Sequence, residues 1–169
     1  MKQAKRPVAL MTVAQVICAL AILPTLFFSF GCNLDPAFMP VDDYHTIGWA
    51  PWVLNGLVLL RDLVIGLSLV FVEVEVFRLC GRMKQSSAFS PLNVAGLGRI
   101  TIALGIAGLV SLLGNSIVPF LLTGLPEIAP VVQYLLLSFT LLTLALMARA
   151  VQVLMRRAVD MQEETDLTI

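Results

Sequence analysis

Four charged residues, Arg61, Asp62, Glu73 and Glu75, stand within one long apolar stretch of this sequence. Charged groups in such surroundings can carry protons or ions, or can hold helices together through polar contacts. The ten residues 63–72 that separate the two pairs span only about 15 Å of helix, whereas a bilayer core is about 30 Å thick. At least one pair is therefore expected in the membrane, where ionisable groups are costly and by default mark a functional site.

The spacing of these residues predicts two polar faces on one helix. Seven and eleven residues separate Asn55, Asp62 and Glu73, which is close to whole turns at about 100° per residue. A second face, about 100° away, carries Arg61 and Glu75. Because adjacent residues on a helix point apart, Arg61 and Asp62 are not expected to contact each other directly. Their partners are expected on another helix, in water or on another subunit.

Three interpretations of this intramembrane polar cluster are open. Asn115 is counted in it, because helix lengths predict that Asn115 lies at the depth of Arg61. The cluster could be structural and set the register of packed helices. It could line a path for protons, ions or a small solute. It could also serve a protein or lipid partner, with basic residues nearby that suit anionic headgroups, namely Arg78, Arg82, Lys84 and Arg99.

The sequence contains none of the motifs that would indicate an enzyme or a metal site. His45 is the only histidine, and it has no second imidazole or thiolate at ligand spacing. There is no zinc-protease, phosphate-loop or serine-hydrolase motif, and no basic surface with interleaved aromatic residues for nucleic acid. We therefore expect a protein that is not an enzyme and binds neither a cofactor nor nucleic acid.

The composition predicts that these residues belong to an integral membrane protein. Of the 169 residues, 59% are hydrophobic and 13% are charged, against about a quarter charged in a soluble domain. Four apolar stretches are long enough to span a bilayer, which predicts a single-domain, all-α four-helix bundle in contact with lipid. The helices are expected at about 8–30, 53–79, 91–122 and 131–160, with an outer loop at 31–51, an inner loop at 80–90 and a tail at 161–169.

The distribution of positive charge predicts the orientation of this bundle. Apart from Arg61, every lysine and arginine lies before the first helix, around the connection between the second and third helices, or near the end of the fourth. By the positive-inside rule, both termini and the middle connection are cytoplasmic.

A stripe of small residues in the third helix, Ala103, Ala107 and Ser111, recurs every four positions. Such a stripe lets a second helix approach closely. The second helix could belong to the same chain or to another copy, so a homo-oligomer is one alternative. Ahead of this helix, Ser90 and Pro91 fit the N-cap and the first helical position.

Two segments on the expected cytoplasmic side carry a family resemblance. The chain ends with Glu163, Glu164, Thr165, Asp166, Leu167, Thr168 and Ile169, and the inner connection reads Ala88, Phe89, Ser90, Pro91, Leu92, Asn93, then Leu97, Gly98, Arg99, Ile100. They resemble the Glu-Glu-Asn-Asp-Leu-Thr-Ile ending and the Pro-Phe-Ser-x-x-Asn and Leu-Arg-x-Ile-Gly patterns of the DUF2975 family of small bacterial membrane proteins. Thr165 replaces the usual asparagine, and Ala88 stands where proline is common.

The resemblance implies a multi-pass protein of the bacterial inner (cytoplasmic) membrane with no assigned activity and no catalytic residues. It also implies a gene that often neighbours a small helix-turn-helix regulator of the Cro/C1 type. It makes Phe89, Ser90, Asn93, Arg99 and the tail from 163 onward candidates for a structural or partner site. We therefore expect a non-enzymatic membrane component or regulator that engages a cytoplasmic protein, and the alternative is a small transporter that uses the intramembrane polar cluster.

The tail also suggests a contact within the chain. Leu167 and Ile169 are expected to fold back onto the inner connection near Phe89, while the acidic residues of the tail meet basic residues there. Such a contact would close the cytoplasmic side of the bundle.

Overall fold

Four α-helices make up nearly all of the computed structural model, which describes residues 5–27, 51–85, 89–114 and 128–167. The helices are α1 (Lys5–Leu26), α3 (Pro51–Gln85), α4 (Pro91–Leu112) and α6 (Ile128–Leu167). Within the described ranges only Phe89 and Ser90 are not helical, and no strand occurs, so the all-α prediction is confirmed. Asn115, Thr168, Ile169 and nearly all of the expected outer loop lie outside the described residues.

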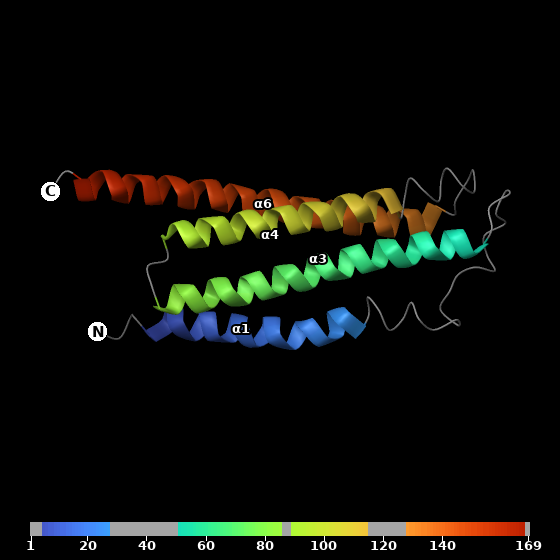
Figure 1. The fold of residues 1–169 in the computed structure, drawn as a ribbon, viewed down its shortest axis with the longest axis horizontal. Coiled ribbons are helices and arrows are strands. Elements are labelled where there is room, and N and C mark those ends of the chain that lie inside the picture. The colour runs from blue at the N-terminus through green and yellow to red at the C-terminus, as the bar shows by residue number, and fades with distance from the viewer. Residues whose placement is uncertain (1–4, 28–50, 86–88, 115–127, 168–169) are drawn as a thin grey trace.

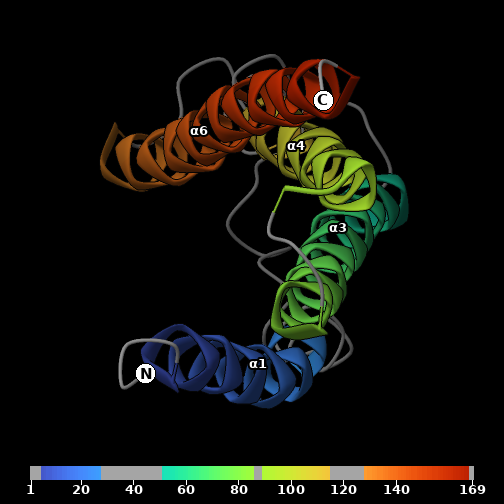
Figure 2. The same ribbon diagram turned by 90° about the vertical axis from the view of Figure 1, so that its left-hand side faces the viewer.

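The helices pack in chain order and form an open, curved row (Figures 1 and 2). The principal contacts join α1 to α3, α3 to α4 and α4 to α6. Seen along the helices, α1 and α6 occupy the two ends of an arc (Figure 2). The start of α1, the end of α3, the start of α4 and the end of α6 all lie at one end of the row, which we call the inner end (Figure 1).

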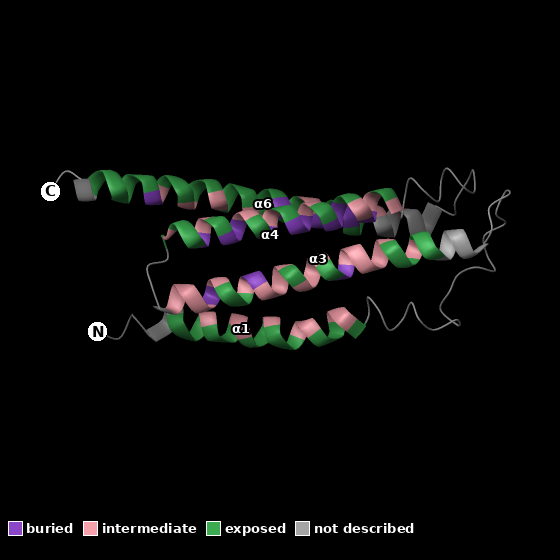
Figure 3. Ribbon diagram, viewed as in Figure 1, coloured by how far each residue is buried: buried purple, intermediate pink, exposed green. Residues whose placement is uncertain are grey.

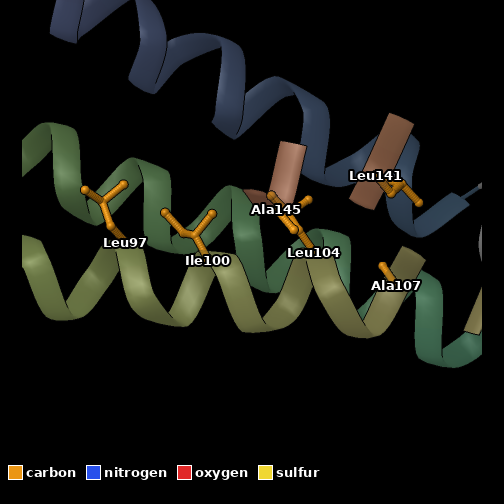
Figure 4. Close-up of a cluster of buried hydrophobic side chains, with 6 residues drawn as sticks. All are labelled: Leu97, Ile100, Leu104, Ala107, Leu141 and Ala145. Carbon is orange, nitrogen blue, oxygen red and sulfur yellow. The ribbon is translucent and has the colours of Figure 1, made fainter. Parts of the chain in front are cut away.

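The core lies along α4, because this helix has a neighbour on each side (Figure 3). Leu97, Ile100, Leu104 and Ala107 of α4 form a buried apolar cluster together with Leu141 and Ala145 of α6 (Figure 4). Partly buried side chains of α3 pack against this cluster. Leucines elsewhere face outward, as at Leu23 of α1 and Leu146 of α6. An apolar exterior of this kind suits contact with lipid chains.

Three of the helices are long and apolar enough to cross a membrane. Within the described residues these stretches are Val8–Leu26, Pro91–Leu112 and Leu135–Thr165. The sequence predicted four such stretches; the remaining one corresponds to α3, which is 35 residues long and whose first five side chains lie outside the described residues. Its apolar sequence is interrupted by Arg61, Asp62, Glu73 and Glu75.

Three helices extend further toward the inner end than the sequence predicted. α1 begins at Lys5 instead of about residue 8. α3 reaches Gln85 instead of residue 79, and α6 reaches Leu167 instead of residue 160. By contrast, α4 begins at Pro91 as expected, because the Ser90 hydroxyl accepts a hydrogen bond from the backbone N–H of Asn93 at 3.3 Å. The connection between α3 and α4 is therefore shorter than the expected loop 80–90.

Candidate functional site: a buried glutamate and its arginines

Glu75 of α3 is buried against α4, with 1% of its surface exposed. Its Oε1 accepts a hydrogen bond at 3.2 Å from Nη1 of Arg78, which lies one turn later in the same helix. Its Oε2 accepts another at 3.2 Å from Nη2 of Arg99 in α4. The side chains of Arg78 and Arg99 are 60% and 51% exposed. One buried carboxylate thus holds two half-exposed guanidinium groups, and the trio carries a net positive charge.

Asn93 makes a second buried polar contact between the same two helices, nearer the inner end. Its side chain is fully buried, and its Oδ1 accepts a hydrogen bond at 3.0 Å from Nε of Arg82 in α3. The Arg82 side chain passes over Gly96, where an added Cβ atom would lie 2.7 Å from Nη2 of Arg82. Gly96 therefore leaves the space that lets Arg82 reach Asn93.

α1 joins α3 through two polar side chains. The Nε2 of Gln15 donates a hydrogen bond to the carbonyl oxygen of Phe77 at 3.1 Å, and Oε1 of Gln15 accepts one from Nζ of Lys84. Further along α1, the Thr25 hydroxyl donates to Oε1 of Glu73 at 2.8 Å. Sequence reasoning placed neither Gln15 nor Thr25 in the site, although a glutamine within an apolar helix was an available signal.

α6 joins α4 through Gln152. Its Nε2 donates a hydrogen bond to the carbonyl oxygen of Val94 at 3.1 Å, and its Oε1 accepts one from Arg149 at 2.6 Å. The amide lies over Gly98, where an added Cβ atom would be 2.5 Å from Nε2. Gln152 was also absent from the predicted site, and its only signal was its polarity within the fourth apolar stretch.

These contacts place polar side chains from all four helices at one level of the row. We call this set the inner polar layer, and it consists of Gln15, Glu75, Arg78, Arg82, Lys84, Asn93, Arg99 and Gln152. It unites Glu75, which the sequence assigned to the intramembrane polar cluster, with Asn93 and Arg99, which it assigned to the candidate structural or partner site. Among the described residues, no group of three or more His, Cys, Asp or Glu side chains could hold a metal ion. The layer can fix helix register and present positive charge.

Arg61 and Asp62 contact each other directly, so the expectation that they could not is wrong. Nε of Arg61 lies 2.7 Å from Oδ1 of Asp62, and Nη2 lies 3.0 Å from Oδ2. The two Cα–Cβ bonds do point apart, but the arginine side chain is long enough to bend back to the neighbouring carboxylate. The stem of Arg61 also lies against Gly114, where an added Cβ atom would be 2.5 Å from Cδ. Asn115 is outside the described residues, as is the side chain of Asn55.

The small-residue stripe of α4 packs within the chain. Ala107 and Ser111 are fully buried, and Ala103 is 7% exposed. The Ser111 and Ser138 hydroxyls lie 2.9 Å apart and join α4 to α6. This close approach of two helices is what small side chains permit. Ala107 and Ser111 are therefore covered by the chain itself.

The tail continues α6 as a helix to Leu167, so the backbone does not fold back before this residue as predicted. The side chain of Leu167 lies outside the described residues. Glu163 and Glu164 are exposed on this helix, and Phe89 is 45% exposed. The i to i+4 hydrogen bonding of a helix carries the chain away from the start of α4 instead of back onto it (Figure 1). The predicted contact of Ile169 falls outside the described residues.

Comparison with known proteins agrees with the family resemblance of the sequence. A family model described as "Protein of unknown function (DUF2975)" matches residues 5–169. No curated protein and no solved structure matches the chain significantly. The matched region contains all four helices, the inner polar layer and the tail. The chain therefore belongs to the DUF2975 family of proteins of unknown function.

Proposed function

We propose that this protein is a non-enzymatic component of the bacterial inner membrane that binds a cytoplasmic protein through the inner end of α6. In this proposal all four helices cross the membrane, and both termini and the α3–α4 connection are cytoplasmic. The excess of lysine and arginine at the inner end supports that orientation.

The observation that carries the proposal is the length of α6. Its 40 residues correspond to about 60 Å of helix, roughly twice the thickness of a bilayer core. The hydrogen bond from Gln152 to Val94 sets the register of α6 against α4, which begins at Pro91. α6 therefore continues beyond the start of α4 (Figure 1), and past Val159, which is still buried, its last eight residues, 160–167, project from the row. A membrane anchor alone does not require such a projection.

The surface of this projection suggests the chemistry of its partner. Every described side chain from 160 to 165 is exposed, and Asp160, Glu163 and Glu164 make this part of the helix acidic. An exposed acidic helix is complementary to a basic protein surface, and such charge complementarity favours fast and selective association. The hypothesis is therefore a cytoplasmic partner with a basic docking surface.

Photo-crosslinking in native membranes tests this proposal. A photoreactive phenylalanine analogue at Gln162 should give a discrete protein adduct, whereas the same analogue at the lipid-facing Leu146 should not. The double variant Glu163→Lys, Glu164→Lys should remove the adduct. The proposal would be contradicted by the absence of any adduct from Gln162, or by an adduct that survives charge reversal.

One observation favours the alternative, a proton or solute transporter. Glu73 is partly buried between α1 and α3, and within the described part of the chain its Oε2 has no hydrogen-bond partner. A buried carboxylate oxygen with an open position suits a group that lines a path for protons or ions. Purified protein in liposomes should then move protons or a solute, and Glu73→Gln or Asp62→Asn should abolish the flux. Liposomes that show no flux with a broad solute panel would favour the partner proposal.

The orientation has its own test. Cys32 follows the first helix on the expected outer side, so it should react with a thiol reagent that cannot cross the membrane. If Cys32 reacts only after the reagent enters the cytoplasm, the proposed orientation is wrong.

A further inference from the structure

An apolar groove of about 330 Å³ lies between α3 and α4. This volume is at the lower end of the range of about 300–1,000 Å³ that is usual for small-molecule sites. α3 contributes Leu67, Ser68 and Phe71, and α4 contributes Arg99, Ile102, Ala103 and Ile106. From Arg99 to Ile106 the groove follows α4 for about 10 Å. Its predominantly apolar lining suits a hydrocarbon chain.

The groove has a single charged end. Arg99 is the charged residue among its lining, and it belongs to the end that is nearer the start of α4. Arg99 and Arg78 each donate a hydrogen bond to a different oxygen of the Glu75 carboxylate, so a second guanidinium lies close to Arg99. Both arginines are half exposed, whereas Glu75 is buried. An anion that arrives from outside would therefore meet positive charge.

We propose that this groove binds one anionic phospholipid of the inner leaflet, with its phosphate on Arg99 and Arg78 and one acyl chain along Phe71, Ile102 and Ile106. Arg99 is eight residues beyond Pro91, about 12 Å along the helix, and a long arginine side chain can extend from that depth toward the headgroups. Basic pockets between membrane helices on the cytoplasmic side are typical sites for anionic headgroups.

Charge balance supports an anionic lipid over a zwitterionic one. The trio of Glu75, Arg78 and Arg99 carries one net positive charge, which a single phosphodiester neutralises. A zwitterionic lipid brings an additional positive group to the same place. The inference does not depend on the proposed cytoplasmic partner, because the groove lies on α3 and α4 and the projection lies on α6.

Native mass spectrometry of the full chain in mild detergent tests the choice of ligand. The probes are phosphatidylglycerol, phosphatidylcholine with the same acyl chains, and glycerol 3-phosphate, which has no acyl chain. Phosphatidylglycerol should bind at least about fivefold more tightly than phosphatidylcholine, as expected when the headgroups differ by one unit of net charge beside basic residues. Glycerol 3-phosphate should not bind measurably. Equal affinity for the two lipids, or binding of glycerol 3-phosphate as tight as that of the lipid, would overturn the proposal.

Paired variants test the location. Arg99→Gln should weaken phosphatidylglycerol binding about fivefold, whereas Arg149→Gln, an exposed arginine of α6, should leave it unchanged. Glu75→Gln should strengthen binding, because the carboxylate no longer competes with the phosphate for the two guanidinium groups.

A second pair of variants tests the acyl-chain part of the groove. Ser68→Phe should fill the groove and weaken binding. Thr140→Phe is its control, because Thr140 is an exposed residue of α6 that makes the same kind of hydroxyl contact to its own helix as Ser68. Equal losses from Arg99→Gln and Arg149→Gln, or from Ser68→Phe and Thr140→Phe, would exclude this groove. If Arg99→Gln fails to fold, the Ser68 and Thr140 pair decides the outcome.

Discussion

Glu73 and Glu75, two residues apart in α3, hold helices on opposite sides of it: Glu73 accepts a hydrogen bond from Thr25 of α1, and Glu75 accepts one from Arg99 of α4. Residues two apart point about 200° from each other around a helix, so one short polar segment of α3 attaches both neighbours. The two attachments can therefore be disrupted separately.

Thr25→Val should weaken the attachment of α1. The change keeps the shape of the side chain but removes the donor to Glu73, and polar contacts between membrane helices are worth about 0.6 to 1.7 kcal/mol. The unfolding midpoint in mixed detergent should fall. Thr12→Val is the control, because among the described residues the exposed Thr12 hydroxyl donates its hydrogen bond to the Val8 carbonyl of its own helix. Equal effects of the two variants would show that the contact with Glu73 does not stabilise the fold.

Asn93→Ala should destabilise the α3–α4 interface by about 1 to 3 kcal/mol, because it removes a buried acceptor from the Arg82 guanidinium. Asn93→Asp keeps Oδ1 in place and adds a charge opposite Arg82, so it should retain more stability than the alanine variant. The measurement is again the unfolding free energy in detergent. An aspartate variant that is less stable than the alanine variant would argue against the Arg82 contact.

Gly108→Ala should loosen the contact between α4 and α6, whereas Gly105→Ala should not. An added Cβ atom at Gly108 would lie 2.8 Å from Cγ of Leu142 and 3.2 Å from the backbone nitrogen of Leu142, which cannot move alone. At Gly105 nothing lies within 4 Å, so alanine there should be neutral or should stabilise the helix by up to about 1 kcal/mol. Comparable thermal stability of the two variants would contradict the close approach of the helices.

Asp62→Asn should lower stability by about 1 to 3 kcal/mol, because it leaves the Arg61 guanidinium without its carboxylate in apolar surroundings. The double variant Arg61→Gln, Asp62→Asn removes both charges and should lose less than the two single variants together. A complete double-mutant cycle in detergent measures this coupling. Strict additivity would mean that the ion pair contributes nothing measurable.

Local sequence signals predicted the elements of this fold well. The Ser90–Pro91 pair marked the start of α4, because a capping hydroxyl and a fixed proline φ act within a few residues. The four long apolar stretches likewise correspond to the four helices. The prediction that Arg61 and Asp62 stay apart failed because it used helix geometry alone and ignored the length of the arginine side chain.

The pairing of residues across helices could not be predicted in the same way. Glu75 and Arg99 are 24 positions apart, and their contact depends on the register and rotation of α3 against α4. That register is set by many apolar contacts and by glycines such as Gly96. Gly96 matters because Arg82 passes over it, and this contact cannot be recognised from the sequence. For the same reason, the polar groups of Gln15 and Gln152 could be recognised as unusual, but their partners could not be named.

The packing of each helix onto the next bears on how the chain is made. Since every principal interface joins helices that follow each other in sequence, each new helix that leaves the ribosome finds its neighbour already in place. The principal interface of each early helix therefore forms without the last helix. Contacts between consecutive helices are close in sequence, which means a low contact order and favours rapid assembly. The ion pair between Arg61 and Asp62 lies wholly within α3, so it can form before α4 is synthesised, whereas Glu75 of the same helix receives its contact from Arg99 only once α4 is present.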